Sequence, residues 1–445
     1  MSPFYDHPVI ELRDPVHGAI AVGSGELAVI DSPLFQRLRH VKQLGFGEYV
    51  FPGAVHHRYL HSIGAMHLAG QVASRALAFV KGLSDPGRRR LVQRARLAAL
   101  LHDVGHPPLS HAAESLLPTR GALLGPEVAD PDARASHEDV SNLVLTASPL
   151  AEALDAAFAA HGVSAREIAA IIDEAHPPIH EDGLDFGPLM HALVSGELDV
   201  DRMDYLLRDS YFAGVQYGIY DRDWILSNVR AVDDGGVVHL GLDVRAVPSF
   251  EHFLLARYHM FQMVYYHPIS DSYDATLRRW LASVGPEARF PASLSEYVHC
   301  TDAWLRARLE ASSDPWARRV VERRPFTLLV ELRTAADREL GPTIRDALAG
   351  AGVEAIGHTA KPVLSRYAQT PAELRRNPLI VVDARPLVGR GPRHQRIEDV
   401  TDLFDRYERV RRVERLYVAP EEKGRAREVL AALGDRLADS PRPLA

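Results

Sequence analysis

Apolar residues recur every three to four positions through most of the first 285 residues. This spacing places them on one face of an α-helix. It predicts helices over about 61–81, 86–103, 137–176, 188–210 and 249–284. Most of the N-terminal two thirds of the chain is therefore expected to be helical.

The N-terminal region carries two other patterns. Residues 7–30 alternate apolar and polar positions around a turn at 17–20, which predicts a short β-ribbon. Pro33 follows Asp31 and Ser32 and predicts the start of a helix that runs to residue 44. The stretch 116–136 is rich in Pro, Gly and Ala and predicts a loop.

After residue 286 the pattern changes to short apolar runs separated by helical stretches. FTLLVEL (326–332), PLIVVDA (378–384) and RLYVAP (415–420) predict strands. The expected fold is mainly α, with an all-helical core and a short N-terminal β-ribbon over 1–285. A smaller α+β domain is expected over 286–435, and a disordered tail over 436–445. The basic segment 385–396 is expected to be a solvated, mobile loop.

Composition narrows the class of protein. The chain has 445 residues, 46% hydrophobic and 25% charged, as in an ordinary globular protein. Its one cysteine, Cys300, excludes an internal disulfide and a multi-cysteine zinc site. No apolar run approaches the roughly 20 residues of a membrane span, and no signal-peptide pattern opens the chain, so a cytoplasmic location is expected. The net charge of −8 argues against a general nucleic-acid-binding surface.

The first candidate for chemistry is the pair His102-Asp103. It ends a predicted helix whose preceding positions are apolar. An imidazole and a carboxylate are costly to bury there unless they are paired or bind something. Together they suit Mn²⁺, Fe²⁺ or Mg²⁺. The dipeptide alone is common, however, and by itself favours a structural or surface position.

Neighbouring segments strengthen that candidate. HDVGHPPLSH (102–111) holds three histidines, and His61 opens another apolar helix. In LDVDRMDYLLRD (198–209), acidic and apolar residues interleave. Asp201, Asp204, Tyr205 and Arg208 have the spacing of one helix face. That helix face either binds a ligand or is exposed to solvent, with its Asp and Arg side chains paired to one another.

The order His61, His102-Asp103, Asp201 resembles the HD-domain metal-dependent phosphohydrolase superfamily. Longer blocks in the same order resemble the deoxynucleoside triphosphate triphosphohydrolases typified by the human SAM-and-HD-domain enzyme and its bacterial relatives. These blocks are DPVHG (14–18), DSPLFQRLRHVKQLG (31–45), FPGAVHHRYLHSIG (51–64), LHDVGHPPLSH (101–111), SHED (136–139) and LDVDRMDYLLRD (198–209). The resemblance covers about residues 8–285. A preceding SAM domain is not expected, because the blocks begin almost at Met1.

The resemblance implies a role for individual residues. One divalent transition metal (Mn, Fe, Zn or Ni) would be held by His61, His102, Asp103 and Asp201, with Mg or Mn accompanying the triphosphate. His111 would be a general acid or a phosphate ligand, and His106, His137 and Glu138 would line the same part of the site. The implied substrate contacts are Gln43, Leu44, Arg58, Arg202, Tyr205, Asp209, Arg257 and Tyr265. Asp31, Gln36 and Arg39 partly match the family's regulatory site, so an activating nucleotide is possible in this protein. The resemblance also implies a homo-oligomer, either a dimer or a tetramer.

Several positions depart from that family. Arg202 replaces a Lys, which changes hydrogen-bond geometry while keeping the charge. Tyr266 stands in place of a Gln and Phe261 in place of a His, both near the sugar or base. Arg13 stands where the family has an Asn of the regulatory site. Base preference and nucleotide activation therefore stay open.

The function expected from these residues is hydrolysis of a deoxynucleoside triphosphate to a deoxynucleoside and inorganic triphosphate. Two alternatives remain. The first is another HD chemistry: a nucleotide phosphohydrolase, a phosphodiesterase, or a di-iron enzyme in which His106, His111 and His137 bind a second metal. The second is a non-catalytic nucleotide-binding sensor that keeps the HD core.

Overall fold

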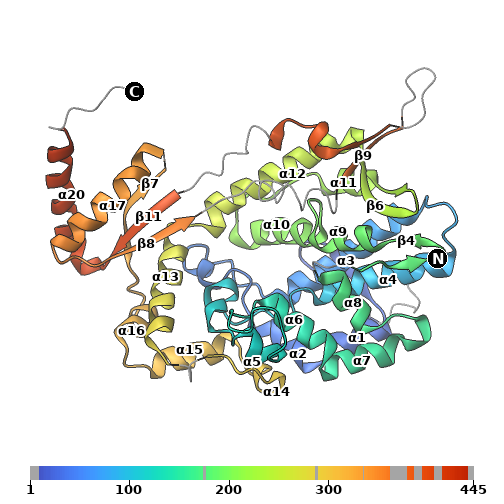
Figure 1. The fold of residues 1–445 in the computed structure, drawn as a ribbon, viewed down its shortest axis with the longest axis horizontal. Helices are drawn as coiled ribbons and strands as arrows, with labels where there is room; N and C mark the ends of the chain where they lie inside the picture. The colour runs from blue at the N-terminus through green and yellow to red at the C-terminus, as the bar shows by residue number, and fades with distance from the viewer. Residues whose placement is uncertain are drawn as a thin grey trace.

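The structure is a computed structural model that describes residues 10–173, 177–285, 289–333, 335–360, 378–384, 393–404 and 413–438. A large, mainly helical body is followed by a smaller unit of strands and helices (Figure 1). The fold is mainly α, as predicted.

The chain opens with an antiparallel hairpin of β1 (Ile10–Asp14) and β2 (Gly18–Val22), which confirms the ribbon. The ribbon is shorter than predicted, because α1 (Ser24–Ile30) follows at once. The Glu26 carboxylate accepts a hydrogen bond from the Gly23 backbone N–H (3.1 Å), which stabilises the first turn of α1. The helix predicted from Pro33 to residue 44 is also shorter: α2 (Pro33–Gln36) passes into a 3₁₀ turn, Arg37–His40.

Two long helices form the centre of the body. α3 (Arg58–Leu77) packs along α4 (Asp85–Leu101), and both agree with the predicted ranges. The Ser84 hydroxyl caps α4 by accepting a hydrogen bond from Gly87 N–H at 3.1 Å. All residues of α4 from Leu91 onward are buried, so this helix lies inside the body.

Shorter helices surround this pair. The predicted helices over 137–176 and 188–210 are each interrupted, because Ser148-Pro149, Ser164 and Asp199 start new helices. The segment predicted as a loop contains one short helix, α5. The elements are α5 (Arg120–Leu124), α6 (His137–Thr146), α7 (Pro149–Phe158), α8 (Ala165–Ile172), α9 (Gly187–Ser195), α10 (Val200–Ala213) and α11 (Arg222–Asn228).

The predicted helix over 249–284 is divided in the middle. α12 (Val247–Met260) runs into a single π-helical turn, Phe261–Tyr265, and α13 (Pro268–Ser283) starts anew. Pro268 cannot continue a helix and suits a first turn. Three further helices complete this part: α14 (Leu294–Tyr297), α15 (Asp302–Ala311) and α16 (Pro315–Val321).

A small mixed sheet lies on the helical body. Its centre is an antiparallel hairpin, β5 (Val229–Asp234) and β6 (Val237–Asp243), which the sequence pattern did not predict. β6 also pairs in parallel with β9 (Ile380–Asp383), so this predicted C-terminal strand joins the sheet of the large body. The sheet is completed by β10 (Arg393–Arg396), β3 (His180–Glu181) and β4 (Leu184–Asp185).

A second sheet forms the core of the C-terminal unit. Its antiparallel strands follow the order β7 (Thr327–Leu332), β11 (Val413–Val418), β8 (Ala355–Ala360). α17 (Ala335–Gly350) and α20 (Lys423–Ala438) share an apolar cluster with β7 and β11. A separate cluster joins the sheet to Ala275 of α13, so the sheet packs against the large body.

The large apolar core includes residues from beyond position 285, where the sequence predicts the boundary between the two domains. The large core includes α15 and α16 up to Val320 and takes in Leu379, Val381, Ile397 and Leu403. The boundary at residue 285 stays a prediction. Of the predicted tail, residues 436–438 belong to α20, and 439–445 lie outside the described residues. Likewise 385–392 of the basic segment lie outside them, and the remaining part is β10.

Among the described residues, no single helix is long and apolar enough to cross a membrane. One bent pair, His137–Thr146 with Pro149–His161, meets the length and composition test at an angle of 54°.

Candidate metal centre and substrate pocket

Three helices bring the four predicted metal ligands together. His61 lies in the first turn of α3, His102-Asp103 follows the last turn of α4, and Asp201 lies in the first turn of α10. His61 Nε2 is 3.0 Å from Asp201 Oδ1 and 3.6 Å from Asp103 Oδ2. His102 Nε2 is 3.5 Å from Asp201 Oδ1 and 3.4 Å from Asp103 Oδ1. The two imidazoles and two carboxylates therefore face a common point.

The donor set fits a transition metal. His61 Nδ1 is bound to Asp204 Oδ2 (2.8 Å) and His102 Nδ1 to the Ala99 carbonyl (2.8 Å). These bonds place the ring protons on Nδ1 and leave both Nε2 lone pairs directed at the common point. Both Nε2 atoms are buried without a hydrogen-bond partner among the described residues. Buried polar atoms rarely lack partners, so a bound cation is the expected one.

Electrostatics at the centre favour a cation. Burial opposes the charged form of His61, but the adjacent Asp201 and Asp204 carboxylates outweigh it and raise its pKa to about 10. A metal ion bound at Nε2 would displace the proton from that nitrogen. Burial also opposes ionisation of Asp103 and Asp201. The Arg58 guanidinium nevertheless holds the pKa of Asp103 well below its usual range, and His102 and His61 do so for Asp201. Both carboxylates are therefore ionised at neutral pH.

Asp204 supports the centre from behind. Its carboxylate accepts hydrogen bonds from His61 and from Arg208 Nε (2.8 Å) and Nη2 (2.9 Å), and His17 Nε2 lies 2.6 Å from Oδ1. A Cβ on Gly64 of α3 would overlap Asp204 and Arg208, so only glycine lets the helices approach here. On the shared helix face, Asp201 thus points at the candidate metal centre, while Asp204 orients the predicted metal ligand His61. The sequence pattern gave no role to His17.

A group of three histidines lies beside the centre. His106, His111 and His137 have ring centroids 3.8 to 5.4 Å apart, and one nitrogen of each lies within 4.8 Å of the others. His106 is buried and His111 is exposed. Glu114, which the sequence analysis missed, accepts a hydrogen bond from His137 Nδ1 and lies 3.4 Å from His111 Nδ1. Burial opposes its ionisation, yet these two histidines lower its pKa.

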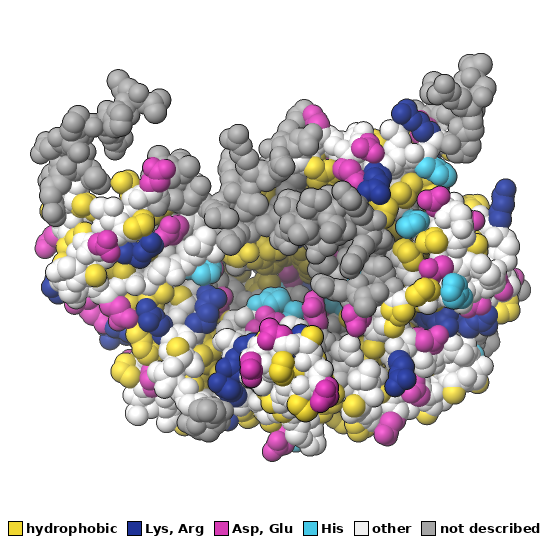
Figure 2. Space-filling view, viewed as in Figure 1, with side chains coloured by type: hydrophobic (Ala, Val, Ile, Leu, Met, Phe, Trp, Pro, Cys, Tyr) yellow, Lys and Arg dark blue, Asp and Glu magenta, His cyan; other side chains and the backbone are white. Residues whose placement is uncertain are grey.

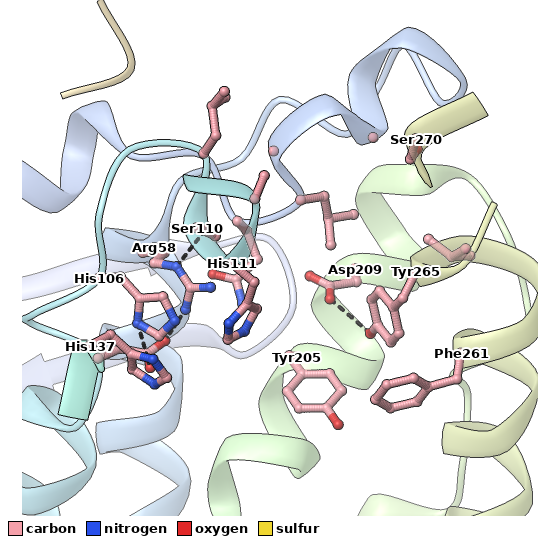
Figure 3. A pocket seen from close by; sticks show the side chains of 18 of the residues that line it. Arg58, His106, Ser110, His111, His137, Tyr205, Asp209, Phe261, Tyr265 and Ser270 are labelled. Carbon is pink, nitrogen blue, oxygen red and sulfur yellow. Dashed lines mark hydrogen bonds and ion pairs between the residues drawn. The ribbon is translucent and has the colours of Figure 1, made fainter. Parts of the chain in front are cut away.

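Arg58 lies near His106 of the histidine group (Figure 3), and it contacts the predicted ligand Asp103. Its Nε donates to Ser110 Oγ at 2.8 Å, and its Nη1 donates to Asp103 Oδ2. Burial and the Arg58 charge hold the pKa of His106 well below its ordinary value. His106 is therefore a neutral imidazole at neutral pH.

One pocket of about 610 Å³ extends from this region across the body. Figure 2 shows histidine and acidic side chains inside a hollow near the middle of this face. His61 lies beneath it, fully buried. The other predicted ligands and the predicted catalytic and substrate residues line it: His102, Asp103, Asp201, His106, His111, His137, Glu138, Gln43, Leu44, Arg58, Arg202, Tyr205, Asp209, Arg257 and Tyr265.

The middle of the pocket is aromatic. Tyr205 and Tyr265 lie edge to face with ring centroids 5.9 Å apart. The Tyr265 hydroxyl donates to Asp209 Oδ2 at 2.9 Å, and His56 Nε2 lies 2.7 Å from Asp209 Oδ1. Tyr265 stands on the π-helical turn, and such turns often re-aim functional side chains. Burial raises the pKa of Tyr205 to about 12, so it remains a neutral hydroxyl.

Two buried arginines add positive charge to the pocket wall. Arg202 lies near Glu197 (3.6 Å) and Asp199 (3.5 Å), and it donates to the Glu197 carbonyl at 3.3 Å. Burial and the nearby Arg202 charge lower the pKa of Arg257. Arginine side chains in the wall of a pocket are suited to a multiply charged anion.

The three residues predicted for an activating nucleotide lie elsewhere. Asp31, Gln36 and Arg39 are not among the pocket-lining residues. Arg39 Nε donates to Gln36 Oε1 (2.7 Å), and its guanidinium lies 3.6 Å from the Tyr59 ring centroid. Their regulatory role stays a prediction. Phe261 and Tyr266, which depart from the family, do line the pocket.

Comparisons with known proteins agree with this geometry. The HD domain family matches residues 58–209, which include all four predicted ligands. The chain is 31% identical over 242 residues to human deoxynucleoside triphosphate triphosphohydrolase SAMHD1, covering 50% of this chain and 36% of that protein. It is 28% identical to the SAMHD1 homolog of Dictyostelium discoideum, covering 68% and 55%. An uncharacterised protein of Methanocaldococcus jannaschii is 31% identical, covering 60% and 48%.

A crystal structure extends the similarity to the fold. A hypothetical protein from Aquifex aeolicus superimposes with a TM-score of 0.72 at 26% identity, covering 95% of this chain and 99% of that one. The chain spans about half the length of the curated relatives it matches. Residues 58–209 therefore match the HD domain family, and the chain resembles the SAMHD1-type deoxynucleoside triphosphate triphosphohydrolases.

Proposed function

We propose that the protein hydrolyses deoxynucleoside triphosphates to a deoxynucleoside and inorganic triphosphate. The observation that carries the proposal is the order of groups in one pocket. A metal centre and an Arg–His cluster occupy one end, and a tyrosine pair beside a carboxylate follows. This order matches the phosphates and the sugar of a nucleotide.

The metal centre supplies Lewis acidity and activation of water when a divalent ion is held by His61, His102, Asp103 and Asp201. In the proposed reaction, water attacks the α-phosphorus, and the bond from that phosphorus to the 5′-oxygen breaks. The oxygen of the attacking water stays on the released triphosphate, and the departing 5′-oxygen takes up a proton to become the deoxynucleoside hydroxyl.

Positive side chains neutralise the charge that develops in this step. Arg58 lies between the metal centre and the histidines, and Arg202 and Arg257 approach from α10 and α12. Preorganised charges of this kind are often the largest contribution to catalysis. They also oppose the repulsion between an incoming polyphosphate and the two acidic ligands.

A histidine supplies the proton to the leaving oxygen. His111 is exposed to the pocket, and Glu114 lies beside both His111 and His137. Imidazole is well suited to protonate a leaving oxygen near neutral pH. His106, whose pKa is lowered, instead serves as a neutral donor to phosphate.

The sugar is held in the middle of the pocket. Tyr205 presents a ring face, and the Tyr265–Asp209 bond fixes a carboxylate that accepts a hydrogen bond from the 3′-hydroxyl. His56 restrains the other oxygen of Asp209. A closely packed ring leaves no room for a 2′-hydroxyl, which favours deoxyribose over ribose.

Product identification tests the proposal. The protein is incubated with each dNTP and NTP and a phosphodiester panel, with Mn²⁺, Mg²⁺ or Fe²⁺. Release of triphosphate and deoxynucleoside supports it, and hydrolysis of other substrates only contradicts it. Binding of dNTPs without turnover under all metals would instead indicate a sensor.

A matched pair of variants tests the metal centre. Asp201→Ala is expected to abolish metal retention and turnover while the circular-dichroism spectrum is unchanged. Asp223→Ala, an exposed carboxylate paired with Arg222, is the control and is expected to behave as wild type. Full activity of Asp201→Ala would refute the ligand assignment.

A second candidate rests on the three clustered histidines. His106, His111 and His137 form a second group suited to a metal ion, which is the arrangement a dinuclear enzyme needs. Elemental analysis distinguishes the two candidates. One metal per chain, unchanged by His137→Ala, supports the mononuclear reaction. Two per chain, falling to one in that variant, supports the dinuclear one.

A further inference from the structure

The pocket continues past the tyrosine pair to a polar end that the proposed reaction does not use. Ser270, Asp274 and Arg278 of α13 and His358 of β8 line this end. In Figure 3, Ser270 lies beyond Tyr265, on the side away from His106 and His137. A ligand with its phosphates at the histidines therefore points its far end toward α13.

Polar atoms at this end lack protein partners. Ser270 is only 8% exposed, and its Oγ has no hydrogen-bond partner among the described residues. Asp274 is half-buried and makes no hydrogen bond with that part of the chain, although the charges of Arg278 and His358 act on it. Burial raises its pKa to about 7. Since buried polar atoms are nearly always satisfied, the unpaired Ser270 Oγ indicates a polar ligand at this end, and the half-buried Asp274 carboxyl lines the same end.

The neighbouring carboxylate of Asp271, in the same helix, is paired with side chains of the C-terminal sheet. Arg415 of β11 donates to Asp271 Oδ2 (2.5 Å), and His358 Nδ1 lies 3.2 Å from it. These contacts hold the C-terminal sheet against α13. Asp274, about one turn further along α13, has no such hydrogen bond to the described residues, and its neighbouring charges are those of Arg278 and His358.

The four nucleobases differ in the hydrogen-bond donors and acceptors that they could present to Asp274 and Arg278. Guanine places two donors, its ring N1–H and its 2-amino group, side by side, and one carboxylate can accept both. Its O6 and N7 are the acceptors that a guanidinium binds best. Adenine and cytosine each offer one amino group beside an acceptor nitrogen, and thymine offers one N–H between two carbonyls.

We propose that Asp274 and Arg278 form a base-reading subsite that favours guanine, so that dGTP is the preferred substrate. The subsite lies partly on the C-terminal unit, through His358. This inference rests on the proposed function, because that function is what directs the base toward α13.

Competition among substrates tests the inference. The quantity is kcat/KM for each of the four dNTPs, measured on the full chain. Wild type is expected to favour dGTP about tenfold or more, the range of one good bidentate base contact. Asp274→Asn and Arg278→Ala are each expected to reduce the dGTP-to-dATP ratio about tenfold. Arg279→Ala, the adjacent arginine that does not line this pocket, is the control and keeps the ratio.

Two failures are distinguishable. Equal use of the four dNTPs by wild type, or equal losses for all four in Asp274→Asn, overturns base reading and leaves the proposed function standing. If wild type hydrolyses no dNTP, binding of deoxyguanosine and deoxyadenosine is measured by calorimetry. Preferential loss of deoxyguanosine binding in Asp274→Asn then supports the subsite, and equal binding of both nucleosides to wild type overturns it.

Discussion

At the residue scale, the two ring nitrogens of His61 have different partners. Nδ1 is held by Asp204 and Nε2 faces the metal centre. A carboxylate behind a histidine ligand fixes the tautomer and increases its basicity. Asp204 is itself fixed by Arg208 and His17. We therefore expect metal binding at this candidate centre to depend on side chains that would not contact the ion.

Asp204→Asn tests this dependence. We expect the affinity for Mn²⁺ to fall about 10- to 100-fold, because the amide does not orient the imidazole with the same charge. Chelator competition measures it, and thermal unfolding reports any accompanying loss of stability. Asp223→Asn is the exposed control. Unchanged affinity in Asp204→Asn would show that His61 needs no support.

The sequence motif identified the four candidate ligands but not the side chains that support them. His61, His102, Asp103 and Asp201 stand in an ordered motif, and the structure brings them together. His56, His17 and Glu114 were missed, because their partners lie 153, 187 and 23 residues away along the chain. No local pattern reports a hydrogen bond over such separations.

At the element scale, the approach of α3 to α10 positions the metal centre. The contact has no room for a side chain at Gly64, where a Cβ would meet Asp204 and Arg208. We expect Gly64→Ala to destabilise the protein by about 1–3 kcal/mol or more, as overpacked cores do. It should also weaken metal binding.

Urea unfolding and metal titration measure the two effects of Gly64→Ala. Gly434→Ala in α20 is the matched control, since a Cβ there meets nothing. Alanine in an open helical position is expected to stabilise by about 0.5–1 kcal/mol. A Gly64→Ala protein as stable as wild type would show that the two helices can move apart freely.

The ion pair of Glu26 with Arg96 ties α1 to α4. Glu26 is buried, and Gln93 and Arg96 both donate to it. Burial opposes its ionisation, but the Arg96 charge outweighs this and lowers its pKa below 4.5. Because the folded pKa is the lower one, the pair stabilises the protein above about pH 4.5. That stability is lost as pH falls toward the folded value.

Glu26→Gln tests the pair. At neutral pH we expect a loss of about 3–5 kcal/mol in the free energy of unfolding, because Arg96 is left buried without its counter-charge. Chemical denaturation across a pH series measures it. The difference from wild type should shrink as pH falls below 4.5. A difference that does not vary with pH would contradict the assignment.

At the scale of the whole molecule, the C-terminal sheet is joined to the pocket by a few charged contacts. Arg415 of β11 donates to the Tyr266 carbonyl and to Asp271 of α13, and also to Glu331 of β7. These groups are largely buried. They place His358 at the polar end of the pocket.

Arg415→Met tests this junction. Keeping the volume but removing the charge leaves Asp271 buried with less compensation, a change that costs about 3–5 kcal/mol in comparable pairs. We expect the C-terminal unit to melt at a lower temperature in calorimetry. Arg318→Met, an exposed arginine paired with Glu322, is the control. An unaltered melting profile would show that apolar contacts alone hold the sheet.

Local patterns were sufficient for the helical class, the N-terminal ribbon, two of the three strands of the C-terminal sheet (β7 and β11) and the ordered His/Asp motif, but not for β8. Helical periodicity, caps and motif order all lie within short stretches of chain, where neighbouring residues alone decide the preference. Long-range packing decided the rest: β9 pairing with β6, the π-helical turn under Tyr265, and the supporting carboxylate of Asp204. These features form only when segments that are distant in the sequence pack together. A short stretch of sequence therefore cannot predict them.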